Sequence, residues 1–262
     1  MSKIHSKNIR VGELEVHYLT GGQGESLVVV HGGSGSSREW LKNAAVLAEN
    51  YTVYIPDMPG FGHTRPLEGD YFLPEMAEFV DNFSHKLGLE KFHLMGHSLG
   101  GGIALHYVFM FPQKITKLVL VSSMCLGKEI ALWVRLLANP RMCRSVGNAV
   151  LTVLRGVKWL VESLMLASFE FIMPVSATSV HLGGYITTLK EQTTVFLGRL
   201  SEILVPTLVV WGAKDPIVPY RQAYAAAQII PDCQVKVFKE AGHSVYSEEL
   251  AEFSHVLKGF LG

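Results

Sequence analysis

Residues 92–111 read FHLMGHSLGGGIALHYVFMF and carry the strongest structural signal in the chain. A short apolar run, FHLM, leads into GHSLG, and an apolar helical pattern follows directly. In so tight a turn between a strand and a helix, Ser98 needs small neighbours on both sides, and its hydroxyl projects at the positive end of the helix. The glycines from Gly100 to Gly102 each cost roughly 1 kcal/mol relative to alanine, which close backbone packing would explain. We therefore predict Ser98 as a nucleophile, against the alternative of a glycine-rich turn with an incidental serine.

Similar apolar runs recur along the chain, each ended by a glycine or a short loop. Because these runs are continuous rather than alternating, they predict strands buried on both faces, as in a parallel sheet covered by helices. Helical patterns lie between them, and an antiparallel hairpin with its turn at Gly12 precedes them. This alternation predicts a doubly wound α/β sheet. We predict strands at 9–11, 13–19, 27–30, 52–56, 92–95, 117–121, 207–211 and 234–238, and helices at 39–48, 74–87, 99–111, 221–229 and 247–261.

The stretch between Val121 and Thr207 breaks this alternation. It runs for about 85 residues without a convincing strand, and a structureless loop of that length would be unusual inside a compact domain. Unusually apolar helical patterns cover much of it, at 128–137, 145–171 and 185–200. We therefore predict a helical insertion between two strands of the sheet.

Asp215 and His243 share the setting of Ser98, because each follows a predicted strand directly. Asp215 lies in WGAKDPIVP and His243 in EAGH. A nucleophilic serine needs a base, and the base needs an orienting acid. Parallel strands place their carboxyl ends along one edge of a sheet, so the three residues should meet there. Taken singly, Asp215 could cap a helix or start a turn, and His243 could be structural.

A glycine-rich loop, His31 to Ser36, follows the predicted strand 27–30. A tetrahedral intermediate needs backbone N–H donors where its negative charge develops. We predict the amides of Leu99, directly after the serine, and of Gly33 as these oxyanion-hole donors. The alternative is a phosphate-binding loop, but GGSGS matches neither of the usual glycine-rich phosphate motifs.

Composition narrows the function classes further. The 262 residues include 23 Lys and Arg against 23 Asp and Glu, so we expect no broad attraction to nucleic acid or anionic lipid. The longest uncharged run in the apolar part, 171–189, is too polar for a spanning helix, so no membrane partner is expected. Cys125, Cys143 and Cys233 form no metal-ligand cluster, which predicts reduced thiols and no metal. With no signal-peptide pattern at residues 1–19, we expect a cytoplasmic protein.

Five segments match known motifs in order and spacing: HGGSGS (31–36), PDMPGFG (56–62), GHSLGG (96–101), PTLVVWGAKDPIVP (206–219) and EAGH (240–243). Together they resemble the α/β-hydrolase superfamily over almost the whole chain. The resemblance implies an α/β-hydrolase fold, with a mostly parallel eight-stranded sheet flanked by helices and a helical cap between strands six and seven. The core would comprise residues 1–123 and 201–262, and the cap residues 124–200. Asp57 lies in a loop typical of the family and is expected to be structural.

The expected chemistry is acyl transfer to water, with Ser98 as nucleophile, His243 as base and Asp215 as its orienting partner. The first choice is hydrolysis of a carboxylic ester of a small, largely apolar substrate, without a cofactor. Three alternatives stay open: carbon–carbon bond hydrolysis as in the ring-fission product hydrolases that the chain also resembles, perhydrolase activity, and a small-ligand receptor on the same fold.

The apolar insertion is expected to line a pocket above Ser98, as small-molecule sites are usually built. The candidate substrate contacts are His97, Trp133, Trp159 and Phe196. The alternative is that these helices pack only on each other and on the sheet. A small molecule is the expected partner, and a homodimer is left open.

Overall fold

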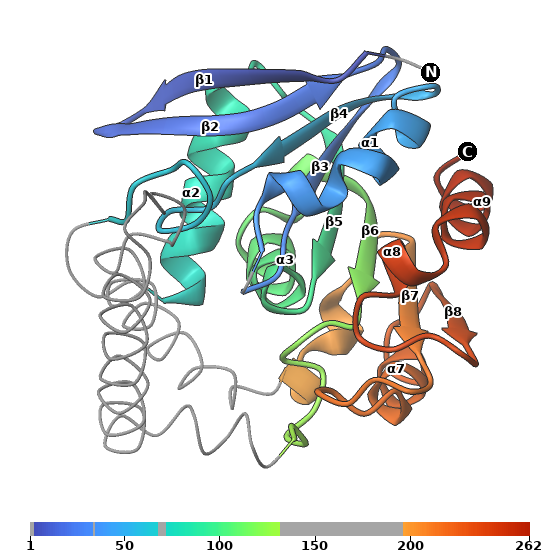
Figure 1. Ribbon diagram of the computed structural model, residues 1–262. Coiled ribbons are helices and arrows are strands. Elements are labelled where there is room, and N and C mark those ends of the chain that lie inside the picture. The colour runs from blue at the N-terminus through green and yellow to red at the C-terminus, as the bar shows by residue number, and fades with distance from the viewer. Residues whose placement is uncertain (1–2, 34, 68–71, 132–195) are drawn as a thin grey trace, which may run out of the picture.

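The computed structural model describes residues 3–33, 35–67, 72–131 and 196–262. Within them eight strands form one sheet in the order β1-β2-β4-β3-β5-β6-β7-β8 (Figure 1). β1 and β2 form an antiparallel hairpin, and β2 pairs antiparallel with β4, whereas all other pairs are parallel. The predicted α/β-hydrolase fold is confirmed. The strands are β1 (His5–Val11), β2 (Leu14–Gly21), β3 (Glu25–Val30), β4 (Tyr51–Pro56), β5 (Phe92–His97), β6 (Ile115–Val121), β7 (Thr207–Gly212) and β8 (Cys233–Phe238).

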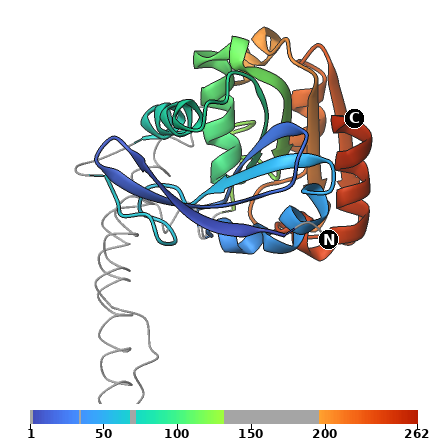
Figure 2. The ribbon, with the colours of Figure 1, turned by 90° about the horizontal axis from the view of Figure 1, so that it is seen from above.

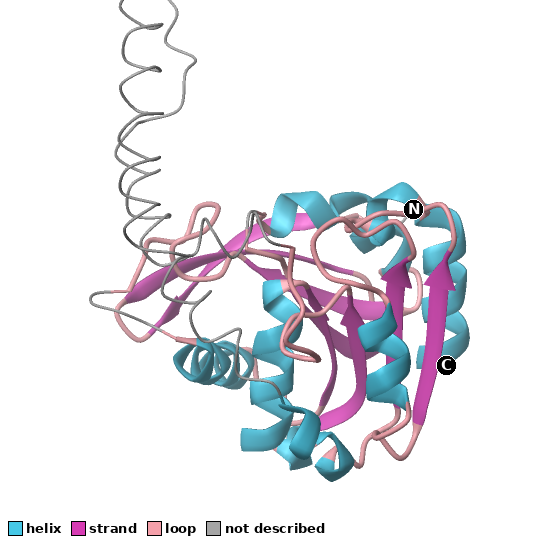
Figure 3. Ribbon diagram, turned by 90° about the horizontal axis from the view of Figure 1, so that it is seen from below, coloured by secondary structure: helices cyan, strands magenta, loops and turns pink. Residues whose placement is uncertain are grey.

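Helices cover both faces of the sheet, which forms the middle layer in Figures 2 and 3. The α2, α3 and α7 helices pack in one apolar cluster, and η1, α1, α8 and α9 pack in the other. The described helices are η1 (Ser37–Trp40), α1 (Leu41–Leu47), α2 (Leu73–Lys86), α3 (Leu99–Met110), η2 (Pro112–Lys114), η3 (Phe196–Gly198), η4 (Leu200–Glu202), α7 (Arg221–Ala227), α8 (Val245–Glu248) and α9 (Leu250–Leu261).

Alternate residues of each central strand enter opposite clusters. In β3, Val28 and Val30 join the cluster of α2 and α3, whereas Leu27 and Val29 join the cluster of α1 and α9. This period of two is the consequence of strand geometry, and burial of both faces explains why the strands read as continuous apolar runs. The core therefore holds the central strands rigidly, with their carboxyl ends at one edge.

Two helices predicted in the insertion differ from the structure where it is described. Residues 128–131, at the start of the predicted helix 128–137, are not helical, because the backbone bonds elsewhere: Ala131 N donates to Ile217 O at 2.9 Å. Residues 196–200, the end of the predicted helix 185–200, are not α-helical either: Phe196–Gly198 form the 3-10 turn η3, and Leu200 begins η4. The rest of the predicted cap, residues 132–195, lies outside the described residues.

In the part of the chain that the structure describes, none of the helices combines the length and hydrophobicity needed to cross a membrane.

Gly212, the last residue of β7, lies against the loop that leads to His243. A Cβ at this position would overlap the carbonyl oxygens of Ala241 and Gly242, which are backbone atoms with no freedom to rotate away. We expect Gly212→Ala to lower the free energy of unfolding by about 1–3 kcal/mol, as overpacking does. Urea unfolding at equilibrium measures this change.

Gly259 provides the matched control, because it lies on the exposed face of α9 and an added Cβ would meet open space. Gly259→Ala should raise the free energy of unfolding by about 0.5–1 kcal/mol through helix propensity. Equal stabilities for the two variants would contradict the close approach at Gly212.

Candidate active site

Ser98 occupies a strained turn between β5 and α3. Its φ and ψ are 52° and −114°, a region that residues other than glycine rarely adopt. Its own backbone is tied down on both sides: Ser98 N donates to Val121 O at 2.9 Å, and Ser98 O accepts from Met124 N at 3.0 Å. Such strain costs of order 1–3 kcal/mol and persists only where the surroundings fix it. Here the end of β6 holds the serine in place.

The glycines around Ser98 permit a close approach of three segments. A Cβ at Gly96 would overlap the carbonyl of Gly100, and a Cβ at Gly100 would overlap the carbonyl of Val30 at the end of β3. The backbone of α3 therefore starts in direct contact with β5 and β3. This contact is the physical reason for the glycine-rich helix start seen in the sequence.

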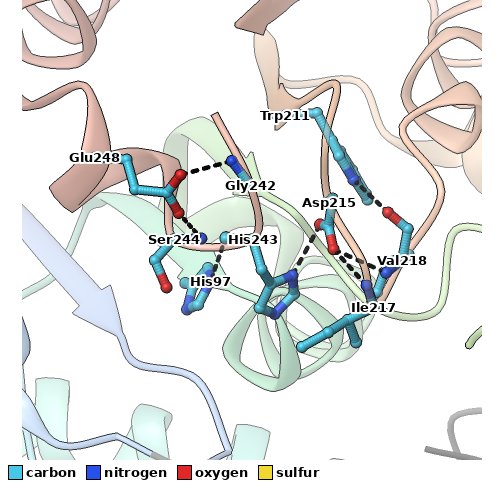
Figure 4. Close-up of polar contacts among 9 residues, drawn as sticks. All are labelled: His97, Trp211, Asp215, Ile217, Val218, Gly242, His243, Ser244 and Glu248. Carbon is cyan, nitrogen blue, oxygen red and sulfur yellow. Dashed lines mark hydrogen bonds and ion pairs between the residues drawn. The ribbon is translucent and has the colours of Figure 1, made fainter. Parts of the chain in front are cut away.

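His243 and Asp215 form a hydrogen-bonded pair at the same edge. His243 Nδ1 donates to Asp215 Oδ2 at 2.8 Å, and the Asp215 side chain is completely buried (Figure 4). The other carboxylate oxygen, Oδ1, accepts from the backbone amides of Ile217 at 2.8 Å and Val218 at 3.0 Å. Asp215 therefore starts a turn and also orients His243, so the two interpretations of the sequence hold together. The pairing leaves Nε2 of a neutral His243 as a proton acceptor.

The loop that carries His243 is held by two further side chains. Glu248, in α8, accepts from Gly242 N at 2.6 Å and from Ser244 N at 3.1 Å. His97 Nε2 donates to the carbonyl of His243 at 3.1 Å (Figure 4). Because His97 directly precedes Ser98, this bond ties the proposed base to the serine turn. Neither contact was predicted from the sequence: Glu248 bonds to the loop directly before its own helix, and the bond from His97 depends on β5 and the His243 loop meeting in space.

His97 is 4% exposed, and its described contacts are those of a support for the His243 loop, whereas the sequence predicted a substrate contact. Its ring packs edge-on against Tyr246 at a centroid distance of 4.8 Å and lies 4.9 Å from the His243 ring. Burial, followed by the proximity of His243, lowers the pKa of His97 to about 3. The residue is therefore neutral at physiological pH, and its Nε2–H donates reliably to the loop.

The loop after β3 lies beside Ser98. A Cβ at Gly32 would come within 3.5 Å of Ser98 Cβ, so the backbone of this loop lies close to the serine at the residue before Gly33. His31 fixes this loop, because its Nδ1 donates to Gly32 O at 2.8 Å and its Nε2 accepts from Met58 N at 3.0 Å. Burial lowers the pKa of His31, consistent with this neutral form. Leu99, the other predicted donor, is the first residue of α3, where backbone amides lack an acceptor within the helix.

Phe196 lies away from the serine turn. Its ring packs against His106 and Phe109 of α3, at centroid distances of 4.7 and 5.0 Å. His106 follows Ser98 by eight residues, which is about 12 Å along a helix. The described contacts of Phe196 are thus core contacts, whereas the sequence predicted a substrate contact. Trp133 and Trp159 lie outside the described residues.

No group of three or more His, Cys, Asp or Glu side chains suited to a metal ion occurs among the residues that the structure describes.

Comparison with known proteins places this geometry in a family. The family described as alpha/beta hydrolase fold matches residues 25–250. The dihydrolipoyllysine-residue acetyltransferase component of the acetoin cleaving system of Cupriavidus necator is 32% identical, over 96% of this chain and 68% of that protein. The 2-hydroxy-6-oxo-6-phenylhexa-2,4-dienoate hydrolase of Comamonas testosteroni is 26% identical, over 99% of this chain and 95% of that protein. The solved structure of the enzyme with that name from Rhodococcus sp. strain RHA1 shares the fold, with a TM-score of 0.79 at 21% identity over 100% of this chain and 99% of that one.

The buried neutral His97 predicts a loss of stability in acid. The unfolded chain binds a proton at this residue below about pH 6.5, whereas the folded protein does so only near pH 3, so stability falls as the pH falls through 6.5. Between pH 7 and pH 5 this single group should remove about 2 kcal/mol from the free energy of unfolding. His97→Gln, which keeps a donor but does not titrate, should show a pH dependence smaller by that amount in urea unfolding.

The exposed His255 of α9 offers the matched control. His255→Gln should leave the free energy of unfolding close to the parent value, because the side chain lies on the protein surface. If His97→Gln also follows the parent, His97 is not held neutral by burial.

Proposed function

This chain belongs to the alpha/beta hydrolase family, and we propose that it is a serine hydrolase that cleaves carboxylic esters through a covalent acyl-enzyme. The observation that carries the proposal is the strained turn of Ser98 at the same sheet edge as the hydrogen-bonded pair of His243 and Asp215. A strained serine at a helix start has little structural purpose, whereas a nucleophile needs a fixed position at the sheet edge, where an incoming carbonyl can meet its hydroxyl.

In the first half of the reaction, Ser98 Oγ attacks the ester carbonyl and His243 Nε2 takes the hydroxyl proton. Asp215 keeps the Nδ1 proton of His243 in place and stabilises the imidazolium that forms. The amides of Leu99 and Gly33 donate to the developing oxyanion. His243 then gives its proton to the leaving alcohol, and the acyl group remains on Ser98.

In the second half, His243 accepts a proton from water, and the resulting nucleophile attacks the acyl-enzyme. Collapse of the second tetrahedral intermediate breaks the bond to Ser98 and releases the carboxylic acid, while His243 returns its proton to Ser98 Oγ. Loop support matters in both halves, because a base displaced by about 1 Å can cost 10²-fold in rate. The bonds from His97 and Glu248 to the His243 loop supply that support.

A second candidate is hydrolysis of a 2-hydroxy-6-oxo-dienoate. The similarity to the Comamonas testosteroni hydrolase, which extends over nearly the full length of both chains, favours it. The same serine, base and oxyanion donors would serve either reaction, so the surroundings of the carbonyl would decide between them. Ring-fission hydrolases often carry an asparagine before the nucleophilic serine and an aromatic residue just after the catalytic histidine. This chain has His97 and Ser244 at those positions, which keeps the ester first.

Ser98 is the first test of this function. A fluorophosphonate probe should label Ser98, and Ser98→Ala should lose labelling and about 10⁶ in turnover without a change in its circular dichroism spectrum. The parent enzyme should be screened with nitrophenyl esters of increasing chain length and with a 2-hydroxy-6-oxo-dienoate. A higher kcat/KM on the dienoate would favour the second candidate, and labelling of another residue in place of Ser98 would refute both.

Asp215→Asn is a sharper test, because the structure fixes the orientation of the new side chain. Oδ1 already accepts from two backbone amides, so the Asn oxygen should keep that position and its NH2 group should face His243 Nδ1. That arrangement favours the wrong tautomer, with the proton on Nε2, and should lower kcat by roughly 10⁴.

Asp215→Ala separates orientation from stability. It also removes the acceptor of the turn, so it should lose stability as well as activity, whereas Asp215→Asn should unfold in urea near the parent midpoint. An Asn variant with parental kcat would mean that a different carboxylate orients the base.

A further inference from the structure

The fold contains a second histidine–aspartate pair with the same geometry as the first. His17 Nδ1 lies 2.8 Å from Asp57 Oδ2, the distance also found between His243 and Asp215. On the other side of the ring, His17 Nε2 lies 2.7 Å from Ser6 Oγ. Ser6, His17 and Asp57 are therefore connected in the order serine, histidine, aspartate at a place remote in sequence from Ser98.

The antiparallel hairpin brings the three residues together. His17 in β2 is paired with Asn8 in β1, and Ser6 lies two residues from Asn8 on the same face of the strand. A serine in this diagonal position is within reach of a long side chain across the ladder. Asp57 follows β4, the other neighbour of β2, and its backbone amide donates to His17 O at 2.8 Å.

The Asp57 carboxylate is built to stay ionised. It is 1% exposed, and it accepts from the backbone amides of Ser37 at 2.7 Å and His63 at 2.9 Å. Burial alone would raise its pKa, but the hydrogen bonds from His63, Ser37 and His17 outweigh that effect and lower it. A neutral His17 must then donate from Nδ1 to Asp57, so its Nε2 lone pair accepts the hydroxyl proton of Ser6. This is the bonding pattern that activates a serine.

A polar groove of about 600 Å³ opens at Ser6. Its described lining carries two cations, Lys7 and Arg65, and one carboxylate, Glu15. The other lining residues are Ser6, Asn8, His17 and His63. Asp57 is buried behind His17 and bonded to two backbone amides, whereas Lys7 and Arg65 line the groove itself, so the surface that meets a ligand favours anionic groups over neutral ones.

We propose that Ser6 is a second nucleophilic serine, which accepts an acyl group from anionic activated esters bound in this groove. Ser6 Oγ attacks the ester carbonyl and forms the new acyl bond, while His17 Nε2 takes the hydroxyl proton. The bond to the leaving oxygen breaks, and His17 returns the proton to that oxygen. Because Ser6 lies within a strand rather than at a helix start, its acylation should be slower than that of Ser98.

The test uses the full chain with Ser98→Ala, so that the proposed catalytic serine cannot contribute. The donors are 4-acetoxy-3-nitrobenzoate, which carries a carboxylate, and neutral 2-nitrophenyl acetate, which leaves the same acetyl group. Tandem mass spectrometry follows acetylation at Ser6 and at Ser247, an exposed serine whose hydroxyl donates to a carbonyl, Ser244 O, instead of contacting a histidine. General-base assistance predicts Ser6 about 10²-fold faster than Ser247.

Three variants complete the design. Ser6→Ala should abolish the adduct, and His17→Gln should bring the rate at Ser6 down to that at Ser247. Lys7→Gln with Arg65→Gln should remove the preference for the charged donor, which added salt should also weaken. The last pair leaves His17 and Asp57 untouched, so it reports on the groove even if His17→Gln disturbs folding.

Equal rates at Ser6 and Ser247 would overturn the proposal. So would acetyl groups found only on His17 or Lys7, because they would show a reactive ring or amine in place of an activated hydroxyl. A preference for the neutral donor would refute the anionic ligand class.

Discussion

The backbone of Ser98 is held at a positive φ, and this conformation requires a close approach of β3, β5, β6 and α3 around the serine. A serine adopts this conformation only where neighbouring segments leave no relaxed alternative. Here the end of β6 binds its backbone amide and carbonyl, and the glycine contacts bring α3 against β5 and β3. A larger residue at Gly96 or Gly100 would separate these elements and release the turn. The glycines lower the helix propensity at the start of α3, but they permit the close packing that fixes the hydroxyl of Ser98.

The loop of His243, the proposed base, is fixed by a different means, through aromatic residues of the apolar cluster that contains α1, α8 and α9. Trp40 of η1 stacks on Tyr246 of α8 at a centroid distance of 4.1 Å, and His97 packs edge-on against Tyr246. This aromatic group joins three elements that are far apart in the sequence, and it lies directly behind the His243 loop. The hydrogen bond from His97, the last residue of β5, to His243 O then fixes the loop of His243 relative to that strand. Ser98 and His243 are therefore both positioned by β5.

The sequence predicted the parts of the site that local patterns encode. Ser98, Asp215 and His243 each follow a buried apolar run, and the structure places all three at the carboxyl ends of β5, β7 and β8. The roles of His97 and His31 could not be predicted, because each depends on which loops meet across the sheet edge. Glu248 bonds locally to Gly242 and Ser244, and no pattern in the sequence marks these contacts. The helix boundary at residues 128–131 was wrong for the same reason: its amides and carbonyls find partners in the 217–222 segment, which propensity cannot foresee.

The two histidine–aspartate pairs separate what such a pair provides from what its surroundings provide. Both have a buried carboxylate that also accepts backbone amides, so both fix the tautomer of the ring and leave Nε2 as an acceptor. They differ in the serine that each can serve. Ser98 lies at the start of a twelve-residue helix, where amides and the helix dipole favour a developing negative charge, whereas Ser6 lies in an edge strand. In both proposals the pair supplies a base, but only Ser98 lies at a helix start whose amides can stabilise an oxyanion, so the position of the serine in the fold accounts for the expected difference in reactivity.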